Sequence, residues 1–129
     1  MIVLDASVLI AHLDRSDAHH ARARKLLDET AGDELGASAI TLAEVLVGPA
    51  RTGRLADARA TIDELGVREL ALGGDAAMRL AELRAHTRLR LPDCCVLFAA
   101  QTAVGAQVAT FDDALARRAR DLGLTVRGR

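Results

Sequence analysis

The chain has 129 residues, of which half are apolar and 27% are charged, and its formal net charge is −1. This balance is typical of a globular protein and excludes a disordered tail, while the length favours one domain over residues 1–129. The near-neutral total points to neither nucleic acid nor membrane, but residues 79–90 and 117–129 are rich in arginine. Such segments are able to follow a phosphate backbone, although a solvated helix face explains each of them equally well.

Short apolar runs alternate with amphipathic stretches along the whole chain. We expect strands at residues 2–5, 35–38, 67–72, 107–110 and 124–127. We expect helices at residues 7–13, 18–29, 41–48, 54–65, 75–89, 92–104 and 113–122, with Gly48 and Pro49 ending the third of them. Alternation of this kind predicts an α/β layered fold around a mostly parallel sheet.

The two cysteines, Cys94 and Cys95, are adjacent in the sequence. Neighbouring cysteines seldom form an unstrained disulfide, and no second cysteine pair suggests zinc, so we expect buried thiols in a reducing compartment. The apolar start lacks a basic leader, and no apolar run approaches the length of a membrane span. We therefore expect a cytoplasmic protein without a membrane partner.

Acidic residues stand where several of the expected strands end. Asp5 closes the first strand, Glu44 lies in the first turn of the helix after the second strand, and Asp93 follows Pro92 at the start of an apolar helix. Asp112, with Asp113 beside it, follows the strand at 107–110. Ligands of open α/β sheets bind beyond the carboxyl ends of the strands, so these acids are candidates for one shared site.

Each acid also has a purely structural explanation. Glu44 follows Thr41 and Asp113 follows Thr110 at the spacing of a capping box, and an acid after proline is favoured at a helix start. Asp5 resists this explanation most, because it interrupts an apolar segment with no lysine or arginine nearby in the sequence. An unpaired buried carboxylate is costly.

Carboxylates gathered at one place repel each other unless a cation neutralises them. A site made only of oxygen ligands suits Mg²⁺ or Mn²⁺, which bind carboxylates, waters and substrate phosphates. Ions held in this way activate water for phosphodiester hydrolysis. Together with the basic segments, the acids favour a metal-dependent nuclease.

Four short stretches resemble the motifs of PIN-domain ribonucleases, and more narrowly of VapC-type toxins from toxin–antitoxin pairs. They are VLDASVLIAHL, SAITLAEVLVG, LPDCCVLFAAQTAVG and VATFDDAL, in the order and at the spacing of that family. The resemblance implies a three-layer α/β/α sandwich with a mostly parallel central sheet. It also implies Mg²⁺ or Mn²⁺ as cofactor, RNA as substrate, cleavage by metal-activated water, a homodimer, and inhibition by a cognate antitoxin.

The same resemblance assigns roles to individual residues. Asp5, Glu44, Asp93 and Asp112 are implied as the catalytic, metal-binding quartet, with Asp113 as an additional ligand through water if Asp112 is the primary one. Ser7 and Thr110 are implied to support the site by hydrogen bonding to it or to bound water. Phe111 departs from the family pattern, in which a polar residue is commoner at that position, and this leaves the choice between Asp112 and Asp113 open.

Two other functions are weighed against the nuclease. An aspartyl-phosphate phosphatase or receiver domain also places acids at strand ends, but it needs a late lysine, and the only lysine here is Lys25. A catalytically weak PIN-like module that binds RNA or a protein partner is the stronger alternative. The four histidines do not fall at zinc-ligand spacings and are expected at the surface.

Overall fold

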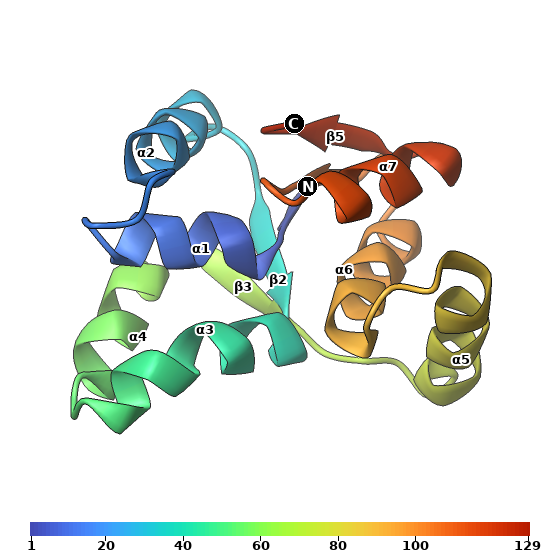
Figure 1. Ribbon diagram of the computed structural model, residues 1–129, viewed down its shortest axis with the longest axis horizontal. Helices are drawn as coiled ribbons and strands as arrows, with labels where there is room; N and C mark the ends of the chain where they lie inside the picture. The colour runs from blue at the N-terminus through green and yellow to red at the C-terminus, as the bar shows by residue number, and fades with distance from the viewer.

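The computed structural model describes all 129 residues (Figure 1). Its strands are β1 (Ile2–Leu4), β2 (Leu35–Ser38), β3 (Val67–Leu70), β4 (Gln107–Ala109) and β5 (Thr125–Arg127). Its helices are α1 (Ala6–Leu13), α2 (His20–Glu29), α3 (Ala39–Arg51), α4 (Leu55–Glu64), α5 (Ala76–Thr87), α6 (Leu91–Thr102) and α7 (Asp113–Asp121). Every expected element is present, most of them within one to three residues of the predicted bounds.

All five strands run parallel, in the order β3-β2-β1-β4-β5. The first strand is central, with Val3 opposite Gly36 of β2 on one side and opposite Val108 of β4 on the other. The chain first builds the sheet outward through β2 and β3 and then returns to add β4 and β5 on the other side. The strand order therefore reverses at β1, and such a switch point opens a crevice at the carboxyl ends of the strands.

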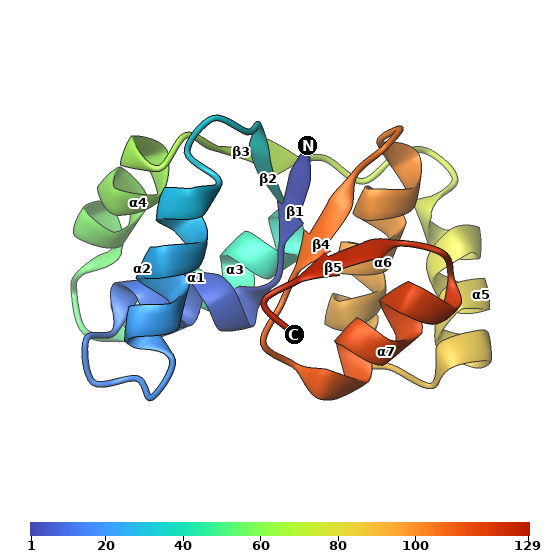
Figure 2. The same cartoon turned by 90° about the horizontal axis from the view of Figure 1, so that it is seen from above.

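The alternation of side chains along β1 divides the apolar interior into two cores. Ile2 and Leu4 pack in a first core with residues of α1 to α4, whereas Val3 packs in a second core with residues of α5 to α7. Figure 2 shows the two groups of helices on opposite sides of the sheet. This arrangement confirms the predicted three-layer α/β/α sandwich with a parallel central sheet.

Helix α3 differs from its predicted bounds at both ends. It begins at Ala39, because the side chain of Ser38 accepts a hydrogen bond from the backbone N–H of Thr41 at 3.2 Å and caps the helix. It continues through Gly48 and Pro49 to Arg51, where the next residue, Thr52, donates its hydroxyl to the carbonyls of Gly48 and Pro49. The prediction that Gly48 and Pro49 end this helix is therefore wrong.

Both capping-box explanations are also wrong. Ser38, not Thr41, caps α3, which places Glu44 in the second turn instead of the first and leaves it without a capping role. Asp112, not Thr110, caps α7 by accepting a hydrogen bond from the N–H of Leu115 at 2.8 Å. The two cysteines are free and buried, as expected. None of the helices combines the length and apolarity needed to cross a lipid bilayer.

Candidate active site

The four predicted acids come from four elements that begin at the carboxyl edge of the sheet. Asp5 is the residue between β1 and α1, Glu44 lies in α3, Asp93 lies in the first turn of α6, and Asp112 immediately precedes α7. The sheet order places the ends of β1, β2 and β4 side by side, so the helices that follow start at the switch point.

Asp5 is only 6% exposed, and its carboxylate is held by hydroxyl groups from two different segments. The hydroxyl of Ser7 donates to Oδ2 at 2.7 Å, and the hydroxyl of Thr110, which follows β4, donates to the same oxygen at 2.8 Å. The backbone N–H of Asp5 also donates to the carbonyl of Ala109 at 2.9 Å. These bonds fix the side chain and leave Oδ1 without a hydrogen-bond donor from the protein.

The hydroxyls of Ser7 and Thr110 also order the segment that leads to Asp112. The backbone N–H of Phe111 donates to Ser7 Oγ at 3.0 Å, and the N–H of Asp112 donates to Thr110 Oγ1 at 3.0 Å. Each hydroxyl therefore donates to Asp5 and accepts from the backbone beside Asp112. This satisfies the buried polar groups of the site and ties Asp5 and Asp112 into one network.

The pKa of Asp93 shows that the other three acids lie within electrostatic reach of it. Burial raises the pKa of Asp93 to about 6, and the charges of Asp5, Asp112 and Glu44 each contribute to this rise, while Arg90 opposes it. The pKa of Glu44 is also raised, first by burial and then by Asp5, and is again lowered by Arg90. Mutual repulsion of this kind requires the carboxylates to lie near one another.

Two acids follow Thr110 and Phe111, and the structure gives them different surroundings. Asp113 forms an ion pair with Arg129, with 2.8 Å between Oδ1 and Nε. Asp112 uses Oδ1 to cap α7, and its charge acts on Asp93, whereas no such effect comes from Asp113. These contacts favour Asp112 over Asp113 as the acid that belongs with Asp93.

Whether these residues suit a divalent ion depends on donor chemistry and spacing. The donors are all carboxylate oxygens, which hard cations such as Mg²⁺ and Mn²⁺ prefer. In this conformation no three histidine, cysteine, aspartate or glutamate side chains are close enough together to hold a metal ion. Mg²⁺ commonly keeps several waters and binds through one or two carboxylates plus substrate phosphates, so the donor set fits such an ion without a closed protein cage.

The sequence profile of the PIN domain matches residues 2–121, which is nearly the whole chain. The chain belongs to the PIN domain family. No curated protein sequence matches it significantly.

Several solved structures share this fold. A toxin–antitoxin complex from Klebsiella pneumoniae superposes with a TM-score of 0.72 at 24% identity, covering 87% of either chain. FitAcB from Neisseria gonorrhoeae superposes with a TM-score of 0.73 at 23% identity, and the match covers 98% of this chain and 96% of the other. VapC20 from Mycobacterium tuberculosis, described as a toxin that cleaves the sarcin–ricin loop, gives 0.70 at 21% identity, covering 92% and 95%.

A C-terminal strap, residues 127–129, holds the segment of this PIN domain that carries Asp112. The carbonyl of Arg127 accepts from the N–H of Thr110 at 3.1 Å, and Arg129 Nε donates to the carbonyl of Phe111 at 3.1 Å. The chain passes so close at Gly128 that a Cβ atom there would lie 2.7 Å from the Thr110 carbonyl oxygen.

Arg22 of α2 makes further contacts that hold the C-terminal strap in place. Arg22 donates to the carbonyl of Gly128 at 2.6 Å, and its guanidinium lies 4.9 Å from the centre of the Phe111 ring. Sequence reasoning missed these supporting residues, and also Arg90, the one cation whose charge reaches both Glu44 and Asp93. The count of arginines in residues 79–90 includes Arg90 but gives no sign of its position.

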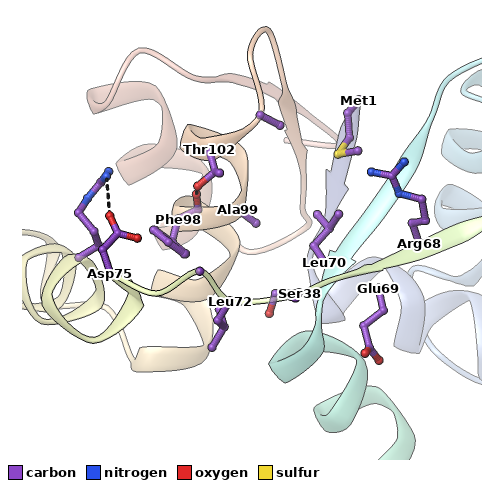
Figure 3. Close-up of a pocket in the computed structure, with 14 residues that line it drawn as sticks. Met1, Ser38, Arg68, Glu69, Leu70, Leu72, Asp75, Phe98, Ala99 and Thr102 are labelled. Atoms are coloured by element: carbon purple, nitrogen blue, oxygen red, sulfur yellow. Dashed lines mark hydrogen bonds and ion pairs between the residues drawn. The ribbon is translucent and has the colours of Figure 1, made fainter.

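A hollow of about 520 Å³ lies away from the acids, beside β3 and α6. Figure 3 shows Leu70, Phe98 and Ala99 around it, with Asp75 at its rim paired to Arg79 at 4.0 Å. None of the four acids of the candidate site lines this hollow. The active-site assignment therefore rests on the carboxylates and not on the shape of this cavity.

Proposed function

We propose that this PIN domain is a metal-dependent endoribonuclease, the toxin of a toxin–antitoxin pair, that hydrolyses RNA phosphodiester bonds with Mg²⁺ or Mn²⁺ as cofactor. The observation that supports the proposal is the network in which the hydroxyls of Ser7 and Thr110 join the buried carboxylate of Asp5 to the backbone at Asp112. Burial first, and then the charges of Asp5, Asp112 and Glu44, raise the pKa of Asp93 to about 6. A protein that only packs or only binds RNA gains nothing from four carboxylates that repel each other at one edge of its sheet.

In this proposal, Asp5, Glu44, Asp93 and Asp112 hold the divalent ion, and Asp113 contributes at most through water because Arg129 pairs with it. Activation of water and neutralisation of phosphate charge are the chemistry that such an ion supplies when bound. Ser7 and Thr110 keep one oxygen of Asp5 occupied, so that Oδ1 is the oxygen available to a ligand. Arg90 supplies a positive charge beside Glu44 and Asp93 that attracts a substrate phosphate.

The partners follow from the same reasoning. We infer a homodimer and a cognate antitoxin, whose inhibitory segment would cover the acids and neutralise them with a basic side chain. The Klebsiella pneumoniae structure, which is described as a toxin–antitoxin complex, shares this fold and supports the inference. A small upstream reading frame with a DNA-binding N-terminus would support it further, and light scattering of the purified chain tests the dimer.

The decisive experiment incubates antitoxin-free protein with structured RNAs in Mg²⁺, Mn²⁺ or EDTA. We expect cleavage with either ion, none in EDTA, and losses of at least about 100-fold for Asp5→Asn and Asp93→Asn, as for the removal of an electrostatic catalytic group. Glu82→Gln is the matched control, because Glu82 is an exposed acid on α5. Cleavage that survives EDTA, or that is unchanged in both variants, contradicts the proposal.

A catalytically weak PIN-like module that binds RNA or a partner is the alternative. The observation in its favour is that no three metal-binding side chains are gathered tightly in this conformation. RNA binding in EDTA together with no cleavage in either ion would favour this alternative.

A further inference from the structure

A second cavity, of about 670 Å³, lies at the far end of α1 and is lined mainly by basic groups. Arg15 follows α1, and His20 and Arg24 project from α2, while His12 lies near the end of α1 itself. No acidic side chain lines the cavity. Figure 1 shows α1, α2 and α4, the elements around it, together at one end of the molecule. We call this cavity the α1–α2 pocket.

The arginine side chains of the α1–α2 pocket form no ion pair or hydrogen bond within the protein. Neither Arg15 nor Arg24 belongs to any of the ion pairs of the chain, and neither guanidinium donates a hydrogen bond to another residue. By contrast, Arg22 is engaged with Gly128 and Phe111. Two guanidinium groups that border one cavity without an ion pair are available to an anion. Arg24 also borders a neighbouring hollow that is lined by Asp28, Asp33 and Glu64, so the positive charge is concentrated on the side of Arg15 and His20.

The two histidines of the pocket are partly exposed and are held in place by contacts. Their rings stack at 6.5 Å between centroids with 20° between planes. His20 Nδ1 lies 2.8 Å from the carbonyl oxygen of Ala11, and because a carbonyl only accepts, Nδ1 carries the hydrogen. His20 Nε2 is therefore the ring nitrogen left to face a ligand, and it donates to a phosphate oxygen only when the ring carries a second proton. Nδ1 of His12 is buried with no hydrogen-bond partner.

The geometry points to an anion site, and we propose that the α1–α2 pocket binds a backbone phosphate of the RNA strand whose cleavage is proposed above. Arginine donors suit phosphate because they bind two oxygens at once and keep their charge at any physiological pH. His12 lies seven residues along the chain from Asp5, or about 10 Å along the axis of α1. A single RNA strand spans such a distance in a few nucleotides, so one strand would reach both sites.

The proposal rests on the proposed ribonuclease function for its choice of ligand, and its test is independent of cleavage. Binding of a fluorescent single-stranded RNA of about 12 nucleotides, a length within the usual range of single-strand sites, is measured by anisotropy in EDTA at several salt concentrations. The variant is Arg15→Gln/Arg24→Gln. The matched control is Arg68→Gln, because Arg68 is an exposed, unpaired arginine on β3 that does not line the α1–α2 pocket.

We expect the double variant to bind RNA about tenfold or more weakly than the wild type, with little change in the control. We also expect its plot of log affinity against log salt to become shallower by about 0.7 for each phosphate that the protein no longer neutralises. A merely structural role for the two arginines would not change this slope. Equal affinities and slopes for the double variant and the control would overturn the proposal, as would a wild-type protein that does not bind RNA.

Inorganic phosphate separates a free-anion site from an RNA site. NMR signals of the His12 and His20 rings should shift on phosphate addition in the wild type and shift much less in the double variant, and RNA should compete with phosphate. Phosphate binding without any effect of the arginines on RNA affinity would overturn the RNA assignment and leave a small-anion site. RNA binding that depends on the arginines, without metal-dependent cleavage, would uphold the pocket and contradict the ribonuclease.

Discussion

The hydroxyl of Thr110 donates a hydrogen bond to the carboxylate of Asp5 at 2.8 Å, across 105 positions of the sequence. Because Thr110 follows β4 and Asp5 follows β1, this bond exists only when the two strands pair in the observed register. It therefore couples the arrangement of the sheet to the arrangement of the acids.

Thr110→Val keeps the shape of a fully buried side chain but removes this donor and the acceptor for the N–H of Asp112. We expect the free energy of unfolding to fall by about 1–3 kcal/mol, because buried polar groups lose their partner, and Mn²⁺ affinity to fall as well. Urea unfolding and calorimetric titration measure the two effects. Thr125→Val, at an exposed position of β5, is the control, and equal stability of the two variants would show that the Thr110 bond contributes nothing.

Asp5→Asn should lower the pKa of Asp93 from its value of about 6, because Asp5 is the strongest charged contributor to that value. An asparagine oxygen still accepts hydrogen bonds from Ser7 and Thr110, so we expect the variant to fold and, without metal, to be at least as stable as the wild type at neutral pH. A carbon-detected NMR titration in EDTA reads the pKa of Asp93.

Asp113→Asn serves as the control for this titration, because Asp113 pairs with Arg129 and does not contribute to the raised pKa. An unchanged pKa of Asp93 in Asp5→Asn would show that the charge of Asp5 does not act on Asp93. Failure of Asp5→Asn to fold would mean that Asp5 has a structural role and not the role of a metal ligand.

The raised pKa of Asp93 predicts how stability depends on pH in the absence of metal. The pKa is higher in the folded chain (about 6) than the reference value of 3.8, so the folded state binds more protons between these two values. The contribution of Asp93 to the free energy of unfolding is therefore greatest at low pH. It falls as pH rises from about 4 to 6 and does not change above that range.

We expect Asp93 to contribute of the order of 1 kcal/mol to this loss, below the full value of a two-unit shift because the side chain is partly solvated. Urea unfolding in EDTA at several pH values measures it, and Asp93→Asn should remove that part of the pH dependence. An identical pH dependence in the wild type and in Asp93→Asn would be inconsistent with this assignment. Mn²⁺ affinity should rise over the same range, since ligands must lose their protons to bind metal.

Gly128→Ala should loosen the segment that carries Asp112. The φ angle of Gly128 is 91°, and its Cβ would lie 2.7 Å from the Thr110 carbonyl oxygen, so the C-terminal strap must move. Gly123→Ala is a matched control, because Gly123 has a φ of 79° but open space around its Cβ. We expect Gly128→Ala to cost at least about 1 kcal/mol more than the control.

Faster amide hydrogen exchange at Phe111 and Asp112 in Gly128→Ala, but not in Gly123→Ala, would locate the effect at this segment. Equal stability of the two variants would show that the close approach at Gly128 is accommodated without cost.

The elements of this fold were predictable because the central strands are short, largely apolar segments, β3 is the start of an alternating stretch, and most helices have a recognisable period. The end of α3 was not predictable. Glycine and proline usually stop a helix, but here the hydroxyl of Thr52 donates to the carbonyls of Gly48 and Pro49, and the helix continues past them. Its start was misplaced for a related reason, since Ser38 and Thr41 are both good caps and only the structure shows which one accepts the bond.

Asp5 and Asp112 were singled out by their positions after strands, and Glu44 and Asp93 by their positions near helix starts. The cost of burying a carboxylate drew attention to Asp5, and the resemblance to PIN-domain ribonucleases joined the four into one set. Their supporting contacts were beyond sequence reasoning, because these contacts join residues that are distant along the chain. Arg129 reaches Asp113 only because β5 pairs with β4, and no residue near Asp113 in the sequence indicates that Arg129 is its partner. The choice between Asp112 and Asp113 therefore needed the structure.

The division of the interior into two cores has a consequence for how the protein would respond to metal. Glu44 belongs to a helix of the first core, whereas Asp93 lies in a helix of the second core and Asp112 caps another. An ion shared by these residues would join the two halves of the molecule, which are the groups of helices that pack on opposite faces of one sheet and touch where α3 meets α6. Its binding energy would then be lost whenever either half opened, so metal would suppress partial unfolding of both halves equally and make the chain unfold as one cooperative unit.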